Sequence, residues 1–135
     1  MTKPVIQVRE LQKIYGDDGV QTPALQGVTF AIRQGEFVAI MGPSGSGKST
    51  MLHILGMLDR PTSGEYLFEG NDMNSYDDDA LAKLRNRKFG FIFQAFNLLP
   101  RTSVLENVKL PLAYAGMTQA KQDKLAMKAI EAVGL

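Results

Sequence analysis

The sequence contains no cysteine, and this absence excludes several kinds of chemistry. Without thiols the chain cannot form disulfides, bind a metal through thiolates or use a catalytic cysteine, and its composition fits a reducing compartment. The sequence also has almost no excess of one charge, because 15 Lys and Arg residues are balanced by 14 Asp and Glu residues, which gives a formal net charge of +1. Strongly basic surfaces are typical of proteins that bind nucleic acids or anionic membranes. We therefore expect no nucleic-acid partner.

Long apolar runs are missing as well. No stretch approaches the roughly 18 consecutive apolar residues of a membrane span, and Lys3 is followed by an alternating segment that does not resemble a signal peptide. Any membrane role is therefore expected to depend on a partner protein. The 135 residues, 44% hydrophobic and 21% charged, match one globular domain with a packed core.

Hydrophobic periodicity and turn residues predict a mixed α/β chain. Alternating patterns indicate three strands, and a glycine-containing turn is expected at residues 15–19. Two further apolar segments lack alternation, as is typical of strands buried on both faces. The strands are expected at about 5–10, 27–33, 36–41, 65–69 and 89–93, and the helices at about 48–58, 75–86, 104–110 (ended by Pro111) and 119–133.

A glycine-rich loop between the apolar segment 36–41 and the helix at 48 has the pattern Gly, four residues, Gly-Lys-Ser. Glycines let successive backbone N–H groups point at one anion, and the following helix adds its positive N-terminal dipole. Lys48 supplies a point charge for the β- and γ-phosphates, and the Ser49 hydroxyl is a hard ligand suited to Mg²⁺. The loop consists of Gly42, Pro43, Ser44, Gly45, Ser46, Gly47, Lys48, Ser49 and Thr50.

A chance glycine-rich turn is the structural alternative for this loop. A buried strand before it and a helix after it are the context that a nucleotide-binding loop requires. The sequence therefore predicts that the chain binds a nucleoside triphosphate together with Mg²⁺.

Several other motifs occur in a fixed order around this loop, and together they resemble one family. The chain is similar over essentially all 135 residues to the N-terminal part of ATP-binding-cassette (ABC) ATPases, in particular the lipoprotein-release and macrolide-export subgroup (LolD/MacB type). The resemblance is carried by residues 11–16, 24–28, 35–50, 58–65, 78–86, 89–94, 96–102 and 106–108.

The resemblance implies roles for two residues outside the loop. Tyr15 matches the aromatic residue that stacks on adenine, although an ordinary hairpin tyrosine is the alternative. Gln94 matches the glutamine that contacts the Mg²⁺ shell and the attacking water, although it could simply cap a strand. Lys48 and Gln94 are thus the candidate catalytic residues, and Ser49 and Gln94 the candidate metal contacts.

The resemblance also implies partners and a location. The apolar segment 96–100 matches the region that receives a helix of the transmembrane permease, although core packing is the alternative. The expected ligands are ATP and Mg²⁺. The expected partners are a separate or fused permease and a second nucleotide-binding domain, at the cytoplasmic face of the bacterial inner membrane.

Parts of the family's machinery are absent from this sequence. There is no Leu-Ser-Gly-Gly-Gln signature motif, no apolar strand ending in Asp-Glu (Walker B) and no switch histidine. We therefore expect residues 1–135 to be the N-terminal portion of one nucleotide-binding domain: a P-loop NTPase, an ABC-type ATPase core with an N-terminal antiparallel β-layer, truncated before the signature motif and Walker B strand. Alone it should bind Mg-ATP weakly and turn over negligible ATP.

Coupling of ATP hydrolysis to transport, through lipoprotein release or drug or peptide export, is the leading expectation for the complete protein. A P-loop nucleotide kinase is an alternative, although such kinases carry the loop near the N-terminus. A non-transport ABC ATPase, for instance in cell division, also remains open; a DNA-repair role is disfavoured because no basic patch occurs.

Overall fold

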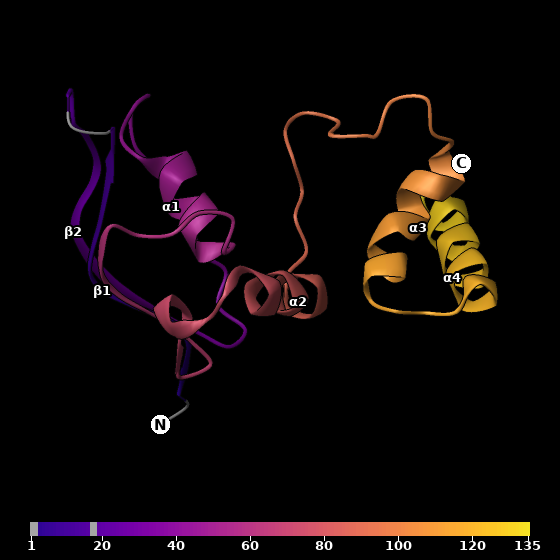
Figure 1. Ribbon diagram of the computed structural model, residues 1–135, viewed down its shortest axis with the longest axis horizontal. Helices are drawn as coiled ribbons and strands as arrows, with labels where there is room; N and C mark the ends of the chain where they lie inside the picture. The colour runs from indigo at the N-terminus through magenta and orange to yellow at the C-terminus, as the bar shows by residue number, and fades with distance from the viewer. Residues whose placement is uncertain (1–2, 17–18) are drawn as a thin grey trace. The chain divides into compact units, whose positions relative to one another are not determined.

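The computed structural model describes residues 3–16 and 19–135, which form two compact units, Met1–Leu81 and Ala82–Leu135 (Figure 1). Helix α2 (Asp78–Lys88) crosses the division between them. The elements in chain order are β1 (Pro4–Tyr15), β2 (Thr22–Arg33), α1 (Lys48–Leu55), β3 (Ser63–Phe68), β4 (Asn71–Asp72), the 3₁₀ helix η1 (Met73–Ser75), α2 (Asp78–Lys88), α3 (Val104–Tyr114) and α4 (Gln119–Ala132).

The first unit is built on an antiparallel sheet with strand order β2-β1-β3-β4. The predicted β-layer is confirmed, but β1 extends well beyond residue 10. A register shift between Val8 and Leu11 accompanies a positive φ of 45° at Glu10, as in a β-bulge. The extra residue lets Val8 and Leu11 both be fully buried although they are three positions apart. In the predicted turn at 15–19, Asp17 and Asp18 lie outside the described residues.

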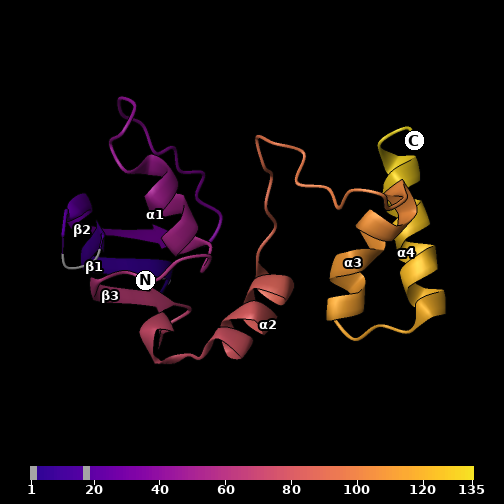
Figure 2. The same ribbon diagram turned by 45° about the horizontal axis from the view of Figure 1, so that its top comes forward.

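Helix α1 lies beside the sheet and supplies much of the core of this unit (Figure 2). Its buried residues Met51, Ile54 and Leu55 recur at helical spacing. The hydroxyl of Tyr66, in β3, donates to the Leu55 carbonyl oxygen at 2.6 Å, and burial raises the pKa of this phenol. The helix ends at Leu55, earlier than predicted; Gly56 is its C-cap, and the next residue, Met57, has a positive φ of 58° that does not continue a helix.

Two predicted strands are wrong. Segments 36–41 and 89–93 lie outside every strand that the structure describes. Their side chains are largely exposed, with Phe37 at 99% and Ile92 at 103% of full exposure. A strand forms only where a neighbouring chain segment pairs with its backbone groups. Among residues 3–16 and 19–135, no strand pairs with either segment.

Helix α2 begins at Asp78, later than the predicted start at about 75, because Met73–Ser75 forms the separate 3₁₀ helix η1. The side chain of Asp77 accepts a hydrogen bond from the Ala80 backbone N–H at 2.7 Å, which is the geometry of an N-terminal cap. Asp78 in the first turn pairs with Arg60 at 2.8 Å. Two residues of the acidic run, Asp77 and Asp78, are therefore used in capping and in ion pairing.

The second unit contains the helical hairpin of α3 and α4, which lie side by side (Figures 1 and 2). Lys109 of α3 is 95% buried, and its ammonium lies 2.7 Å from Asp123 of α4 and 3.1 Å from Glu106. The hydrogen bonds to Asp123 and Glu106 raise the pKa of Lys109. This charged contact joins the two helices.

Proline does not end α3, contrary to the sequence-based expectation. The helix continues through Pro111 to Tyr114. A proline removes its own N–H donor but keeps its carbonyl, which here accepts from the Ala115 N–H at 3.1 Å. Ser103 caps the start of the helix, since its Oγ accepts from the Glu106 N–H at 3.2 Å.

Candidate phosphate-binding site

The glycine-rich loop leads directly into α1, whose first residue is Lys48. Gly47 is the N-cap with φ 84° and ψ 7°, and no side chain caps the helix. The first turn also contains no acidic residue. Because the first N–H groups of a helix have no partner within it, this helix start keeps backbone donors and its positive dipole end for an anion.

Gly47 is fixed by its surroundings as well as by its conformation. A Cβ added there would lie 2.4 Å from the Ala24 carbonyl oxygen and 3.0 Å from a methyl carbon of Leu25. Gly45 also has a positive φ, 78°, but a Cβ added there would have nothing within 4 Å. The loop therefore rests directly on β2 at Gly47, which sets the position of the helix start.

Lys48 turns back over the loop. Its ammonium donates to the carbonyl oxygens of Gly42 at 2.9 Å and Pro43 at 2.6 Å. The Ser46 N–H donates to the Pro43 oxygen at 3.3 Å and closes the turn. The loop thus gathers an ammonium group, helix amides and hydroxyl groups in one place, a donor set that fits the phosphates of a nucleotide. The hydroxyl-bearing residues are Ser44, Ser46, Ser49 and Thr50.

A hollow of about 580 Å³ adjoins the loop within the first unit. One side is apolar and is formed by β2, with Val28, Phe30 and Ile32, and by the extended segment 38–41. The other side is formed by the loop and the start of α1, including Ser46 and Lys48. The loop therefore lies at the border between an apolar hollow and solvent.

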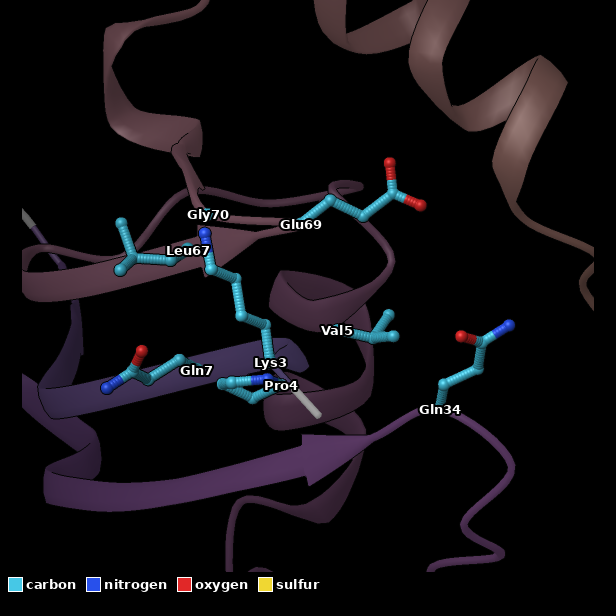
Figure 3. A pocket seen from close by; sticks show the side chains of 8 residues that line it. All are labelled: Lys3, Pro4, Val5, Gln7, Gln34, Leu67, Glu69 and Gly70. Carbon is cyan, nitrogen blue, oxygen red and sulfur yellow. The ribbon is translucent and has the colours of Figure 1, made fainter. Parts of the chain in front are cut away.

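A second hollow of about 460 Å³ lies in the same unit and shares no lining residue with the loop. The side chain of Lys3 extends toward Gly70, whereas the carboxylate of Glu69 points away from it (Figure 3). Its walls lack the run of glycines that the first site has, so its shape is not that of a second phosphate loop. Its lining residues are Lys3, Pro4, Val5, Gln7, Gln34, Leu67, Glu69 and Gly70.

Tyr15 is the last residue of β1 and is 41% exposed. Its hydroxyl donates to Asp59 Oδ2 at 2.8 Å, and the Lys13 ammonium lies 4.8 Å from its ring centroid. The sequence predicts a role for Tyr15 but does not indicate either of these two partners. The two-residue spacing of Lys13 and Tyr15 on one strand could have indicated their contact. Asp59 gave no such signal, because it is 44 residues from Tyr15.

Gln94 lies in the second unit, in an exposed bend outside the helices and strands. Its joint action with Lys48 remains a prediction. In the neighbouring segment, Leu98 and Leu99 are 64% and 48% exposed. The Leu99 N–H donates to the Asn107 side chain of α3 at 2.8 Å, which ties this apolar segment to the helical hairpin.

Within residues 3–16 and 19–135, no three or more His, Cys, Asp or Glu side chains gather in a way that could hold a metal. In the phosphate loop, the residue chemically suited to a divalent cation is Ser49, whose hydroxyl could act together with phosphate oxygens and water, as is usual for Mg²⁺. In the same described part of the chain, no helix is long and apolar enough to cross a membrane.

Residues 25–135 match the ABC transporter family. The chain belongs to this family. It is 51% identical over 133 residues to an uncharacterized ABC transporter ATP-binding protein of Thermotoga maritima. It is 46% identical over 133 residues to the macrolide export ATP-binding/permease protein MacB of Marinobacter nauticus. These matches cover 98% of this chain, and the predicted family resemblance is confirmed.

Solved ABC cassettes share the fold. A dimeric ATP-binding cassette bound to ADP and Pi in a post-hydrolysis state matches with a TM-score of 0.84 and 44% identity, over 93% of this chain and 56% of that one. The chain spans 57% of the Thermotoga maritima relative and 21% of the Marinobacter nauticus MacB. The predicted fold class, the N-terminal region of an ABC-type ATPase with an antiparallel β-layer, is confirmed.

Proposed function

We propose that residues 1–135 form the N-terminal portion of an ATP-binding domain of an ABC transporter. The loop 42–50 holds the phosphates, with Lys48 and the α1 amides as donors, and Tyr15 stacks on the adenine. The observation that carries this proposal is the uncapped start of α1, joined to a loop over which the Lys48 ammonium lies, bonded to the Gly42 and Pro43 carbonyl oxygens. The Lys48 ammonium, the positive end of the α1 dipole and the hydroxyl groups of the loop all favour a negatively charged ligand at this position.

The ligand is proposed to be ATP with Mg²⁺. The metal supplies charge neutralisation on the phosphate oxygens. Ser49 offers its exposed hydroxyl to the metal, and Gln94 is proposed to contact the same metal and the attacking water. Lys48 and Gln94 are thus the proposed catalytic residues.

The complete protein is proposed to couple ATP hydrolysis to transport across the bacterial inner membrane. Relatives named for macrolide export and for pyoverdine export, the latter PvdT of Pseudomonas fluorescens at 49% identity, support export of a small molecule, with lipoprotein release as the other candidate. The dimeric cassettes among its structural relatives support pairing of two such domains. The domain is proposed to bind the cytoplasmic side of a separate or fused permease.

Calorimetric titration of the chain with ATP and Mg²⁺ tests the binding site. Lys48→Ala should weaken ATP binding at least tenfold, because it removes the charge-assisted contact to the phosphates. Lys128→Ala, an equal charge change at an exposed position of α4, is the matched control and should leave the affinity unchanged. Equal affinities for the wild type and Lys48→Ala would refute the assignment of the loop.

The permease surface is proposed to include Leu98 and Leu99. A Leu98→Asp substitution places a charge on an exposed apolar segment and should reduce co-purification with the permease while leaving ATP affinity within about twofold. A folded Leu98→Asp protein that still assembles normally would remove this segment from the proposed interface.

A further inference from the structure

Three hydrogen-bond donors converge on the carboxylate of Asp59, in the loop between α1 and β3. Its Oδ1 accepts from the Lys13 ammonium at 2.7 Å and from the Arg60 backbone N–H at 2.7 Å. Its Oδ2 accepts from the Tyr15 hydroxyl at 2.8 Å. Both carboxylate oxygens are thus occupied, and two of the three donors come from the end of β1.

The charges at this cluster favour an ionised carboxylate. Burial raises the pKa of Asp59, but the hydrogen bonds from Lys13 and Tyr15 outweigh this effect and hold its pKa below the usual value. The side chains of Lys13 and Asp59 are 13% and 28% exposed, so solvent screens their contact only partly. Lys13 also donates to the Arg60 carbonyl oxygen at 2.7 Å, which leaves its ammonium little freedom.

The same contacts define the placement of the Tyr15 ring. Asp59 fixes the hydroxyl at the edge of the ring. It also holds the Lys13 ammonium, which stands over the ring 4.8 Å from its centroid. A cation at this distance is attracted by the ring electrons and covers one ring face. The ring is therefore restrained at its edge and on one face, while 41% of the residue stays exposed.

We propose that Asp59 is a positioning residue that orients the Tyr15 ring, with Lys13 behind it, to stack on the base of the bound nucleotide. This inference rests on the proposed function, since it needs Tyr15 to contact the base. A side chain that is ordered before binding loses less conformational freedom when the ligand arrives. Asp59 itself does not touch the ligand and acts through Tyr15 and Lys13.

The test compares two ligands that differ only in the presence of a nucleoside. ATP and inorganic tripolyphosphate, each with Mg²⁺, are titrated into the wild-type chain and its variants. Asp59→Ala should weaken ATP binding about fivefold, since ring ordering is lost, and leave tripolyphosphate binding unchanged. Asp79→Ala, the same charge change at an exposed position of α2, is the control and should alter neither.

A double-mutant cycle decides whether Asp59 acts through the ring. In a Tyr15→Ala background, Asp59→Ala should have no further effect on ATP affinity, because no ring remains to be oriented. The inference is overturned if Asp59→Ala weakens both ligands equally, or if its effect on ATP persists in the Tyr15→Ala background. Asp59→Asn, which keeps the side-chain volume, replaces Asp59→Ala in the cycle if circular dichroism shows that the alanine variant is unfolded.

The same measurements separate this inference from the proposed function. If Lys48→Ala changes neither ligand's affinity, the phosphate site itself is wrong. If Tyr15→Ala weakens ATP but Asp59→Ala does not, only the positioning role fails. If Tyr15→Ala leaves ATP affinity unchanged, base stacking and the role of Asp59 are both rejected, while the phosphate site stands.

Discussion

Gly47 combines a left-handed backbone with direct contact to β2, so two independent effects oppose any side chain there. We expect Gly47→Ala to lower the free energy of unfolding by about 3 kcal/mol, through backbone strain plus the 2.4 Å approach to the Ala24 oxygen. Gly45 has nearly the same φ, but a Cβ there would meet open space, so Gly45→Ala should lower the free energy of unfolding by only about 1 kcal/mol. Urea unfolding measures both; equal losses would show that the contact with β2 is unimportant.

Near the phosphate loop, the sequence correctly predicted the helix that follows, which begins at Lys48, but not the strand expected before the loop at 36–41. The function proposed for the loop depends on residue types at consecutive positions, and local sequence carries this information. The contact of Tyr15 with Asp59, in contrast, depends on the fold and could not be predicted from local sequence. Asp59 is distant in sequence, and only the pairing of β1 with β3 and the loop before it brings the two together.

At the scale of elements, Tyr66 joins β3 to the C-terminal end of α1. Tyr66→Phe keeps the ring but leaves the buried Leu55 carbonyl oxygen without this donor, and should cost about 1–3 kcal/mol of stability. Tyr114→Phe, at a residue 76% exposed, should change stability by less than about 0.5 kcal/mol. Thermal unfolding of the two variants tests this; similar midpoints would contradict the anchoring role.

The contact between the end of β1 and the loop before β3 should depend on pH. Because folding lowers the pKa of Asp59, its contribution is fully present above the unfolded value of about 3.8 and is lost as pH falls through the lower folded value. The stability difference between wild type and Asp59→Asn should therefore be largest near neutral pH and shrink below pH 3.8. Chemical unfolding at several pH values measures it; a constant difference would argue against an ionised Asp59.

Strands that the sequence indicated at 36–41 and 89–93 show where prediction from sequence fails. Their apolar character was correctly identified, but a strand also requires a hydrogen-bonding neighbour, which local sequence does not specify. Helices were predicted more reliably, since their backbone bonds are internal and only their boundaries were misplaced, chiefly at the ends Leu55 and Tyr114 and at the α2 start, Asp78. The role of Gln94 remains a prediction, because the loop at 42–50, with which it is proposed to act, belongs to the other unit.

At the scale of the whole molecule, large apolar side chains are exposed in both units, among them Phe37, Ile92 and Phe96. Such surfaces favour self-association. We expect the sedimentation coefficient of the chain to rise with concentration, and Ile92→Lys to weaken that dependence. Lys128→Ala should leave it unchanged, and a concentration-independent value for the wild type would disprove the expectation.

The ammonium of Lys48 is already held by the carbonyl oxygens of Gly42 and Pro43. Anion capture at this loop is therefore an exchange, in which incoming oxygens compete with two existing acceptors. A single sulfate or inorganic phosphate gains little by replacing them, whereas a chain of phosphates can engage the ammonium and the helix amides together. We therefore expect the resting loop to bind long phosphate chains in preference to single anions, so that common buffer anions are poor competitors for ATP.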